Sequence, residues 1–157
     1  MEGPLFGRGR TIVCRVSDSI ARYRTCSEVG DIDGLMEVLA PDAEVVSPIS
    51  GRMVFRGHDD VKALLGAVYG SLKELRWTEV VGEGAHRVVL GHARIGPVRM
   101  TDAMVFELDA DGRIRRISPH LRPWLALTLF ALVLGPKVGR RPGVMWRALR
   151  GGGPTRP

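Results

Sequence analysis

The sequence predicts an α+β fold in which a strongly curved antiparallel sheet wraps around three N-terminal helices, with an extra apolar and basic helical segment at the C-terminus. Patterns of helical period come first in the chain, and patterns that alternate at every second residue follow, joined by turn residues. The 157 residues, of which 45% are hydrophobic and 25% charged, suffice for one domain with a real core.

Three helices are predicted in the first half of the chain, over about 17–29, 31–40 and 59–72. Ser17 or Asp18 can cap the first helix, and Asp31 can cap the second. Apolar residues recur at helical spacing, which places them on one face of each helix. The residues expected on these faces are Val16, Ile20, Tyr23, Cys26 or Ser27, Ile32, Leu35, Met36, Leu39, Val61, Leu64, Leu65, Val68, Tyr69 and Leu72.

Strands are predicted from short alternating runs that are bounded by glycine, proline and aspartate. The turns Ile-Gly-Pro and Asp-Ala-Asp-Gly join the later strands into antiparallel hairpins. The predicted strands are 43–47, 53–56, 75–83, 86–95, 98–108 and 113–118.

One carboxylate stands on the apolar face of the predicted strand 98–108. The residues of that face are Val98, Met100, Asp102, Met104, Phe106 and Leu108. An ionised carboxylate is costly to bury among such side chains, so it is paired, neutralised or used in chemistry. Asp102 is therefore the first candidate for a functional residue.

Three segments in sequence order resemble one known family: ARYRTCSEVGDIDGLMEVLAPDAEVVSPISG, FRGHDDVKALL and TDAMVFELDADGRI. Over about residues 16–122 the chain resembles the SnoaL-like, ketosteroid-isomerase-like branch of the nuclear transport factor 2-like superfamily. The resemblance implies a cone of bent sheet around three helices, with a deep and mostly apolar pocket, and often a homodimer. We divide the chain into an N-terminal lead (1–14), this domain (15–122) and an extension (123–157).

The resemblance also implies roles for individual residues. In ketosteroid isomerases a tyrosine of the first helix and a protonated aspartate form the oxyanion hole, and Tyr23 and Asp102 fall at those positions. The isomerase base is an aspartate before the turn proline, where this chain has Ser47. Limonene-epoxide-hydrolase relatives place a catalytic carboxylate at the position of Asp102, but with an arginine where this chain has Met100.

His120 is the predicted partner of Asp102. It stands at the end of the last strand, about where relatives place a second polar group, and an imidazole titrates near neutrality. We therefore expect Asp102, Tyr23 and His120 to form the catalytic set, with Asp102 as the protonated acid and His120 as the base. The residues expected to contact a substrate are Ser47, Phe55, Trp77, His92, Met100, Met104 and Trp124.

These features predict a cofactor-independent acid/base enzyme that acts on an apolar polyketide-, terpenoid- or steroid-like small molecule. Isomerisation, ring closure of the polyketide-cyclase type and epoxide hydrolysis all remain open as the reaction. The alternative is a non-catalytic ligand-binding or dimerisation module of the same fold. No metal is expected, because no histidine, cysteine and carboxylate cluster has ligand spacing, and no phosphate loop or dinucleotide fingerprint is present.

The net charge of +6 is a property of the C-terminal part. Residues 1–111 carry 13 basic and 17 acidic side chains, whereas residues 112–157 carry ten basic and no acidic ones. The acidic body argues against binding of nucleic acid. The stretch WLALTLFALVL is apolar all round but shorter than the roughly 20 residues that span a bilayer. The segment 123–150 is expected to cover the pocket, to pack on a partner subunit or to lie in a membrane interface.

The cysteines and the N-terminus bear on location. Cys14 and Cys26 show neither metal-binding nor redox spacing, which indicates free thiols in a reducing compartment. The first ten residues contain no long apolar run of the kind found in secretory signals. We expect a cytoplasmic protein, with peripheral membrane contact through the C-terminal segment as an option.

Overall fold

The computed structural model describes residues 11–150, and the side chains of residues 19–150. The expectations for the first ten and last seven residues, and for the side chains of Cys14 and Val16, lie outside this part of the chain. The helices are α1 (Thr11–Val29), α2 (Ile32–Val38), α3 (His58–Tyr69), α4 (Trp124–Gly139) and α5 (Pro142–Arg150). The three predicted N-terminal helices are confirmed, although α1 begins earlier than the expected cap at Ser17 or Asp18.

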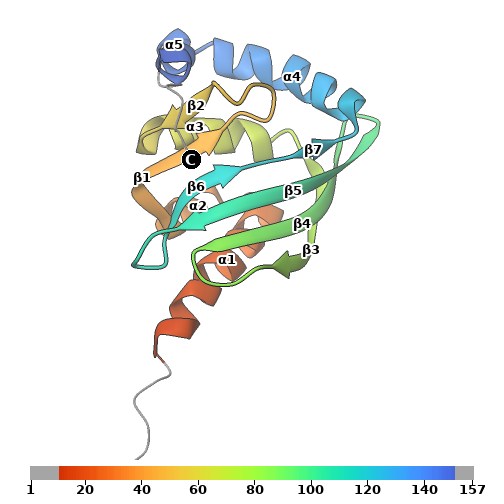
Figure 1. Cartoon of the computed structure of the whole chain (residues 1–157). Coiled ribbons are helices and arrows are strands. Elements are labelled where there is room, and N and C mark those ends of the chain that lie inside the picture. The colour runs from red at the N-terminus through yellow and green to blue at the C-terminus, as the bar shows by residue number, and fades with distance from the viewer. Residues whose placement is uncertain (1–10, 151–157) are drawn as a thin grey trace, which may run out of the picture.

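Seven strands form one curved sheet that does not close into a barrel (Figure 1). They are β1 (Leu39–Val46), β2 (Val54–Arg56), β3 (Lys73–Val81), β4 (His86–Ile95), β5 (Val98–Leu108), β6 (Ile114–Ser118) and β7 (Leu121–Arg122). The spatial order is β2-β1-β6-β5-β4-β3, and β7 pairs with β5. The predicted α+β class with a curved sheet is confirmed.

One strand pairing differs from the antiparallel expectation, because β1 runs parallel to β6. The two strands are joined through α3 and the β3–β5 meander, and a long crossover of this kind is what parallel neighbours require. The sheet is therefore mixed. Its remaining pairings are antiparallel.

The inner face of β5 carries the core as the alternation predicted. Met100, Met104, Phe106 and Leu108 are all buried. Phe106 packs edge-on against Tyr23 of α1, with the ring centroids 4.9 Å apart, and neither side chain is exposed. This contact fixes α1 against the sheet. Met104 and Asp102 are the next two residues along the same face of β5.

The last two helices, at the top of Figure 1, cover one end of the sheet. The helix α4 is longer than its sequence indicated, since it continues through Pro136 to Gly139. Proline removes one helical hydrogen bond, but Pro136 is exposed, and the buried Leu134 and Val138 hold the helix on either side of it. Among the described helices, none combines the length and apolarity needed to cross a bilayer.

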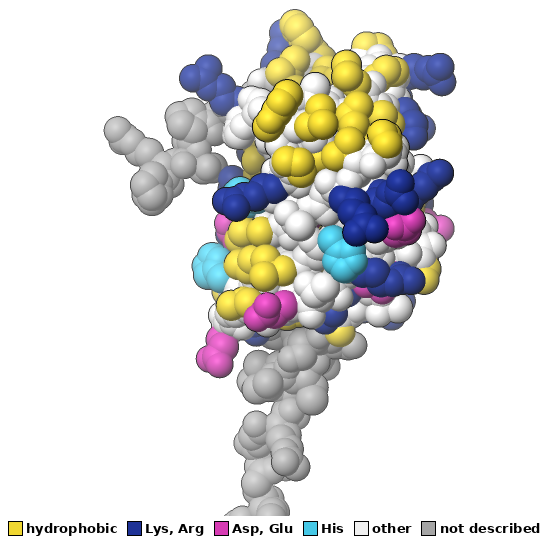
Figure 2. Space-filling view, turned by 90° about the vertical axis from the view of Figure 1, so that its right-hand side faces the viewer, with side chains coloured by type: hydrophobic (Ala, Val, Ile, Leu, Met, Phe, Trp, Pro, Cys, Tyr) yellow, Lys and Arg dark blue, Asp and Glu magenta, His cyan; other side chains and the backbone are white. Residues whose placement is uncertain are grey.

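Polar contacts fasten this end to α3. The Arg147 guanidinium donates two hydrogen bonds to the buried Asp60 carboxylate, at 2.8 Å and 2.6 Å. These bonds hold the pKa of Asp60 below its usual value. The Lys137 ammonium donates to the Ser71 hydroxyl at 2.7 Å. The outer side of α4 stays exposed, and Figure 2 shows hydrophobic side chains gathered over the top of the molecule.

Candidate functional site

A cavity of about 150 Å³ lies between the inner face of the sheet and the helices α1, α3, α4 and α5. Its wall is almost entirely apolar. The C-terminal helices contribute Phe130, Leu134, Val138 and Met145 to this wall, so they roof the cavity. Its polar side chains come from the body of the protein and are Tyr23, Ser47, Tyr69 and Asp102.

Asp102 lies at a break in the pairing of β5. The outer edge of β5 pairs first with β7, at Asp102 and Thr101, and then with β6, from Val105 onward. Between these two strands the backbone amide of His120 turns toward the carboxylate and donates a hydrogen bond to Oδ1 at 3.2 Å. The irregular link between β6 and β7 thus supplies the donor that holds Asp102 in place.

The environment of Asp102 favours its neutral form. Burial among apolar side chains raises the pKa of the carboxyl to about 6, although the His120 amide and the charge of His120 act in the opposite direction. The group therefore changes charge close to physiological pH. A carboxyl with a pKa in this range can both accept and return a proton at useful rates.

Trp77 and Asp102 lie in the same cross-strand row, with Gly91 between them. The strand register places Trp77 opposite Gly91, and Gly91 opposite Asp102. The indole ring packs directly on the glycine, since a Cβ at position 91 would lie 2.5 Å from Cε3 of Trp77. Only glycine leaves room for the ring here, so Gly91 decides how close the tryptophan lies to the acid.

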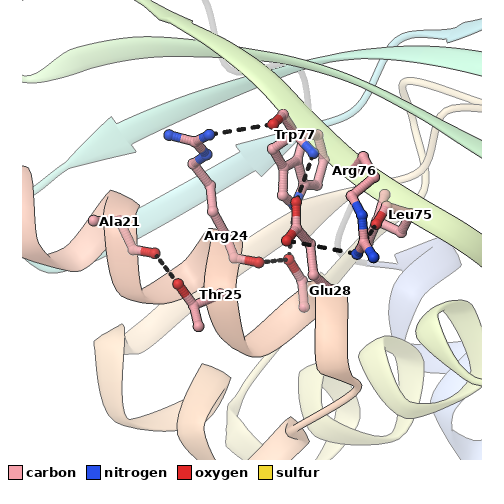
Figure 3. A network of polar contacts seen from close by, with 8 residues as sticks. Ala21, Arg24, Thr25, Glu28, Leu75, Arg76 and Trp77 are labelled. Carbon is pink, nitrogen blue, oxygen red and sulfur yellow. Dashed lines mark hydrogen bonds and ion pairs between the residues drawn. The ribbon is translucent and has the colours of Figure 1, made fainter.

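Polar contacts with α1 hold Trp77 (Figure 3). Its backbone amide donates to Glu28 Oε1 at 2.8 Å, and its carbonyl accepts from Arg24 at 3.2 Å. Its indole nitrogen donates to the Ser27 hydroxyl at 2.8 Å. A residue of the cavity wall is thereby fixed to the helix that carries Tyr23.

Two tyrosine hydroxyls face each other in the cavity wall. The Tyr23 and Tyr69 oxygens are 2.7 Å apart, and either can be the donor. Burial raises the pKa of both phenols well above the usual value, and the nearby charge of Asp102 acts in the same direction. Both hydroxyls therefore keep their protons, and they can donate hydrogen bonds but not act as bases.

Tyr69 was missed as a site residue. Its place in the apolar stripe of the third predicted helix indicated core packing, and its ring is indeed buried. What the stripe does not reveal is the hydroxyl partner, which lies on α1. A tyrosine among aliphatic residues of a buried face, with an oxygen that needs a partner, was the available signal.

The predicted site residues divide into two groups. Ser47, Phe55, Trp77, Met100 and Met104 line the cavity together with Tyr23 and Asp102. His120, His92 and Trp124 do not. The His120 ring is exposed, with Nδ1 3.1 Å from the Ser118 carbonyl oxygen. His92 is exposed on the outer face of the sheet, and Trp124 is 76% exposed on α4.

Few of the described residues that line the cavity carry a titratable group. Asp102 is the only carboxyl among those that line the cavity, and no imidazole lines it. In the part of the chain with described side chains, no three histidines, cysteines or acids lie close enough together to hold a metal ion. The polar side chains that line the cavity are thus one carboxyl, two phenols and one serine hydroxyl.

Comparisons with known proteins agree with this geometry. A sequence profile of the SnoaL-like domain matches residues 20–117. No curated protein matches the chain. A protein with a cystatin-like fold from Silicibacter pomeroyi is 23% identical, with a TM-score of 0.71 over 84% of this chain and 90% of that one.

Two further solved structures have the same fold. A steroid delta-isomerase from Pseudomonas aeruginosa is 24% identical, with a TM-score of 0.70 over 82% of this chain and 92% of the isomerase. An NTF-2 like protein from Burkholderia xenovorans is 16% identical, with a TM-score of 0.63 over 70% and 84% of the two chains. At these identities the similarity establishes the fold.

Proposed function

The chain belongs to the SnoaL-like domain family, with the NTF2-like fold, and we propose that it is a cofactor-independent enzyme that moves a proton on an apolar small molecule. The observation that carries the proposal is a single carboxyl, Asp102, largely shielded from water beside an apolar cavity, with a pKa of about 6. A pair of tyrosine hydroxyls lines the same cavity.

The geometry favours Asp102 as the group that both takes and returns the proton. The sequence pattern suggested Asp102 as the acid and His120 as the base, but the His120 ring is exposed and no other base lines the described cavity. In its ionised form Asp102 can remove a proton from the carbon next to a carbonyl. In its protonated form it can then deliver that proton to a different carbon of the same molecule.

The tyrosine pair supplies the matching electrophilic group. Removal of the proton turns the carbonyl into an enolate, whose oxygen carries the developing negative charge. A Tyr23 or Tyr69 hydroxyl that donates to this oxygen in a dry cavity lowers the barrier by roughly 3 kcal/mol. The net reaction is an isomerisation in which one C–H bond breaks, another forms and a double bond moves. The steroid delta-isomerase among the similar structures supports this class of reaction.

The size of the cavity limits the first substrates to test. An apolar cavity of about 150 Å³ holds a benzene-sized molecule. A monocyclic β,γ-unsaturated ketone fits this volume, whereas a four-ring steroid requires the roof helices to move. Conversion of such a ketone to the conjugated isomer is followed by its ultraviolet absorbance.

The decisive variants are Asp102→Asn and Ser47→Ala, since both residues line the cavity. We expect Asp102→Asn to lower kcat/KM at least about 100-fold and Ser47→Ala to change it by no more than about twofold. The wild-type kcat/KM should rise with pH through about 6, because the ionised carboxyl starts the reaction. Equal losses in the two variants, or a rate that falls through this pH, would refute the assignment.

A second function has its own observation in favour. The roof residues Phe130, Leu134 and Val138 enclose the cavity, as in a protein that stores an apolar ligand. A carrier would retain a co-purified ligand, identified by mass spectrometry, and would bind it equally well after Asp102→Asn. Tight binding without turnover of any tested ketone would favour the carrier over the enzyme.

A further inference from the structure

We propose that the outer side of α4, together with an arginine-lined hollow on the adjacent outer face of the sheet, forms a docking surface for an anionic phospholipid bilayer. The hollow, of about 620 Å³, is lined by Arg76, Arg94, Arg99 and Arg122. Arg122 and Pro123 of its wall lead directly into α4 at Trp124. The apolar side and the hollow are therefore continuous.

The outer side of α4 is apolar and unusually exposed. Trp124 is 76% exposed, Leu125 45%, Leu132 66% and Val133 38%. At about 100° per residue these side chains spread over roughly half of the helix circumference, on the side opposite the buried Phe130 and Leu134. A helix of 16 residues with such a face is suited to lie in the plane of a membrane interface, where tryptophan is favoured.

Two of the four arginines of the hollow are available to an anion, whereas Arg76 pairs with Glu28. Arg99 and Arg122 form no ion pair and no side-chain hydrogen bond with any described residue. Arg94 contacts Glu74 at 3.2 Å, and its Nε is buried without a partner in the described part of the chain. Figure 2 shows basic side chains beside and below the hydrophobic cluster at the top of the molecule. Arginine binds phosphate oxygens with paired N–H groups, which fits a lipid headgroup.

Charge decides between a bilayer and a second copy of this chain. Residues 112–157 contain no acidic side chain, and Glu74 is the only acid among the described residues that line the hollow. A two-fold symmetric contact through this surface would bring like arginines together. An anionic bilayer instead offers negative charge to the arginines and acyl chains to the leucines.

The test is flotation of the full-length chain with phosphatidylcholine vesicles, either alone or mixed equally with phosphatidylserine. We expect binding to the mixed vesicles and much weaker binding to phosphatidylcholine alone. Leu132→Glu should weaken binding at least about tenfold, because it removes an exposed leucine that would contact the acyl chains and adds a negative charge. The double variant Arg99→Glu and Arg122→Glu should weaken it at least about 25-fold, at roughly fivefold for each arginine lost.

Matched controls place the same changes elsewhere on the surface. Val29→Glu alters an equally exposed apolar residue at the end of α1. The double variant Arg113→Glu and Arg115→Glu makes the same charge change more than about 20 Å away along β5. Both controls should bind like the wild type. Equal loss in the controls, or no binding of the wild type to mixed vesicles, would overturn the proposal.

Measurements of oligomeric state and thermal unfolding on the same proteins distinguish two other occupants of this surface. If a second copy covers this surface, the wild type is a dimer in solution and Leu132→Glu makes it monomeric, which overturns the bilayer as the partner. If free phosphate is the ligand, inorganic phosphate protects the wild type against thermal unfolding while mixed vesicles do not bind it, which also overturns the proposal. A monomer that binds mixed vesicles through both Leu132 and the arginines supports it.

Discussion

The two faces of one strand ladder carry opposite chemistry. Across β3, β4, β5 and β7, the inner row of neighbours consists of Trp77, Gly91, Asp102 and Leu121. The outer row consists of the residues next to them in the chain, Arg76, His92, Thr101 and Arg122. In the inner row Trp77, Asp102 and Leu121 line the apolar cavity, and all four residues of the outer row line the arginine hollow.

The comparison shows that residues adjacent in the sequence lie in the two different environments. Alternation of side chains along a strand moves a residue from a dry cavity to the solvent in one step. On the inner face a substitution changes packing or desolvation, and its cost is large. On the outer face water and salt screen the same change. Substitutions of chain neighbours should therefore produce effects of two different sizes.

The largest difference is expected between Phe106 and Arg99, which lie on opposite faces of β5. Phe106→Ala removes a fully buried ring that packs on Tyr23, and should lower the free energy of unfolding by about 4 kcal/mol. Arg99→Ala removes an exposed side chain and should change it by no more than about 0.5 kcal/mol. Urea unfolding measures both. Similar values for the two variants would contradict the division into faces.

The next effect is a gain of stability at Asp102. Its pKa is about 6 in the folded protein against 3.8 for the free side chain, so the folded state binds more protons between these values. Stability from this group is present below about pH 4 and is lost as the pH rises through about 6. Asp102→Asn should therefore raise the unfolding free energy above pH 6, by up to about 3 kcal/mol.

The same variant should gain almost nothing below about pH 4, where the carboxyl is neutral in both states. Thr101→Ala, on the outer face, serves as the control and should show the same offset at every pH. Unfolding in urea at several pH values provides the measurement. A gain for Asp102→Asn that does not depend on pH would show that the carboxyl is not desolvated.

A smaller loss is expected at Gly91. A methyl group there would lie 2.5 Å from Cε3 of Trp77 and 2.8 Å from the carbonyl oxygen of Arg76. Because part of this wall is backbone, Gly91→Ala must shift Trp77 or the strand, and should cost about 2 kcal/mol. His92→Ala should cost no more than about 0.5 kcal/mol. Thermal unfolding compares them, and an equal cost would mean that the ring has room to move.

The smallest change in stability is expected at Glu74, on the rim of the arginine hollow. Its ion pair with Arg94 is partly exposed, so Glu74→Gln should change the unfolding free energy by no more than about 0.5 kcal/mol. Loss of the negative charge should nonetheless tighten binding to mixed vesicles by about fivefold. Glu83→Gln, in the loop after β3, is the control. If Glu74→Gln binds vesicles like the wild type, the hollow is not part of the docking surface.

The features that the sequence predicted correctly are those encoded by periodicity. The inner face of β5 and its carboxylate follow from alternation, and the buried stripe of α3 follows from helical spacing. The family resemblance is confirmed by the profile match over residues 20–117. These patterns are local, since each needs only the residues of one element.

The features that the sequence missed depend on contacts between distant elements. The parallel pairing of β1 with β6 follows from the path of the whole chain. The direction of the His120 ring depends on the two-residue break between β6 and β7, which leaves no periodic signal. His92 shares its face with Arg94, whereas Ala93 and Ile95 on the opposite face are small or apolar and buried. That contrast in the sequence indicated that His92 lies on the face of β4 opposite the cavity.

The two phenolic oxygens of Tyr23 and Tyr69 can exchange the direction of their hydrogen bond without movement of either ring. With the shared proton turned one way, the free hydroxyl presents hydrogen to a guest, and with it turned the other way it presents a lone pair. A guest whose oxygen changes from ketone to enol during its stay would thus find a matching neighbour before and after. This exchange of donor and acceptor roles needs only the rotation of two hydroxyl groups. It would let the cavity bind both tautomers without a change in the position of either ring.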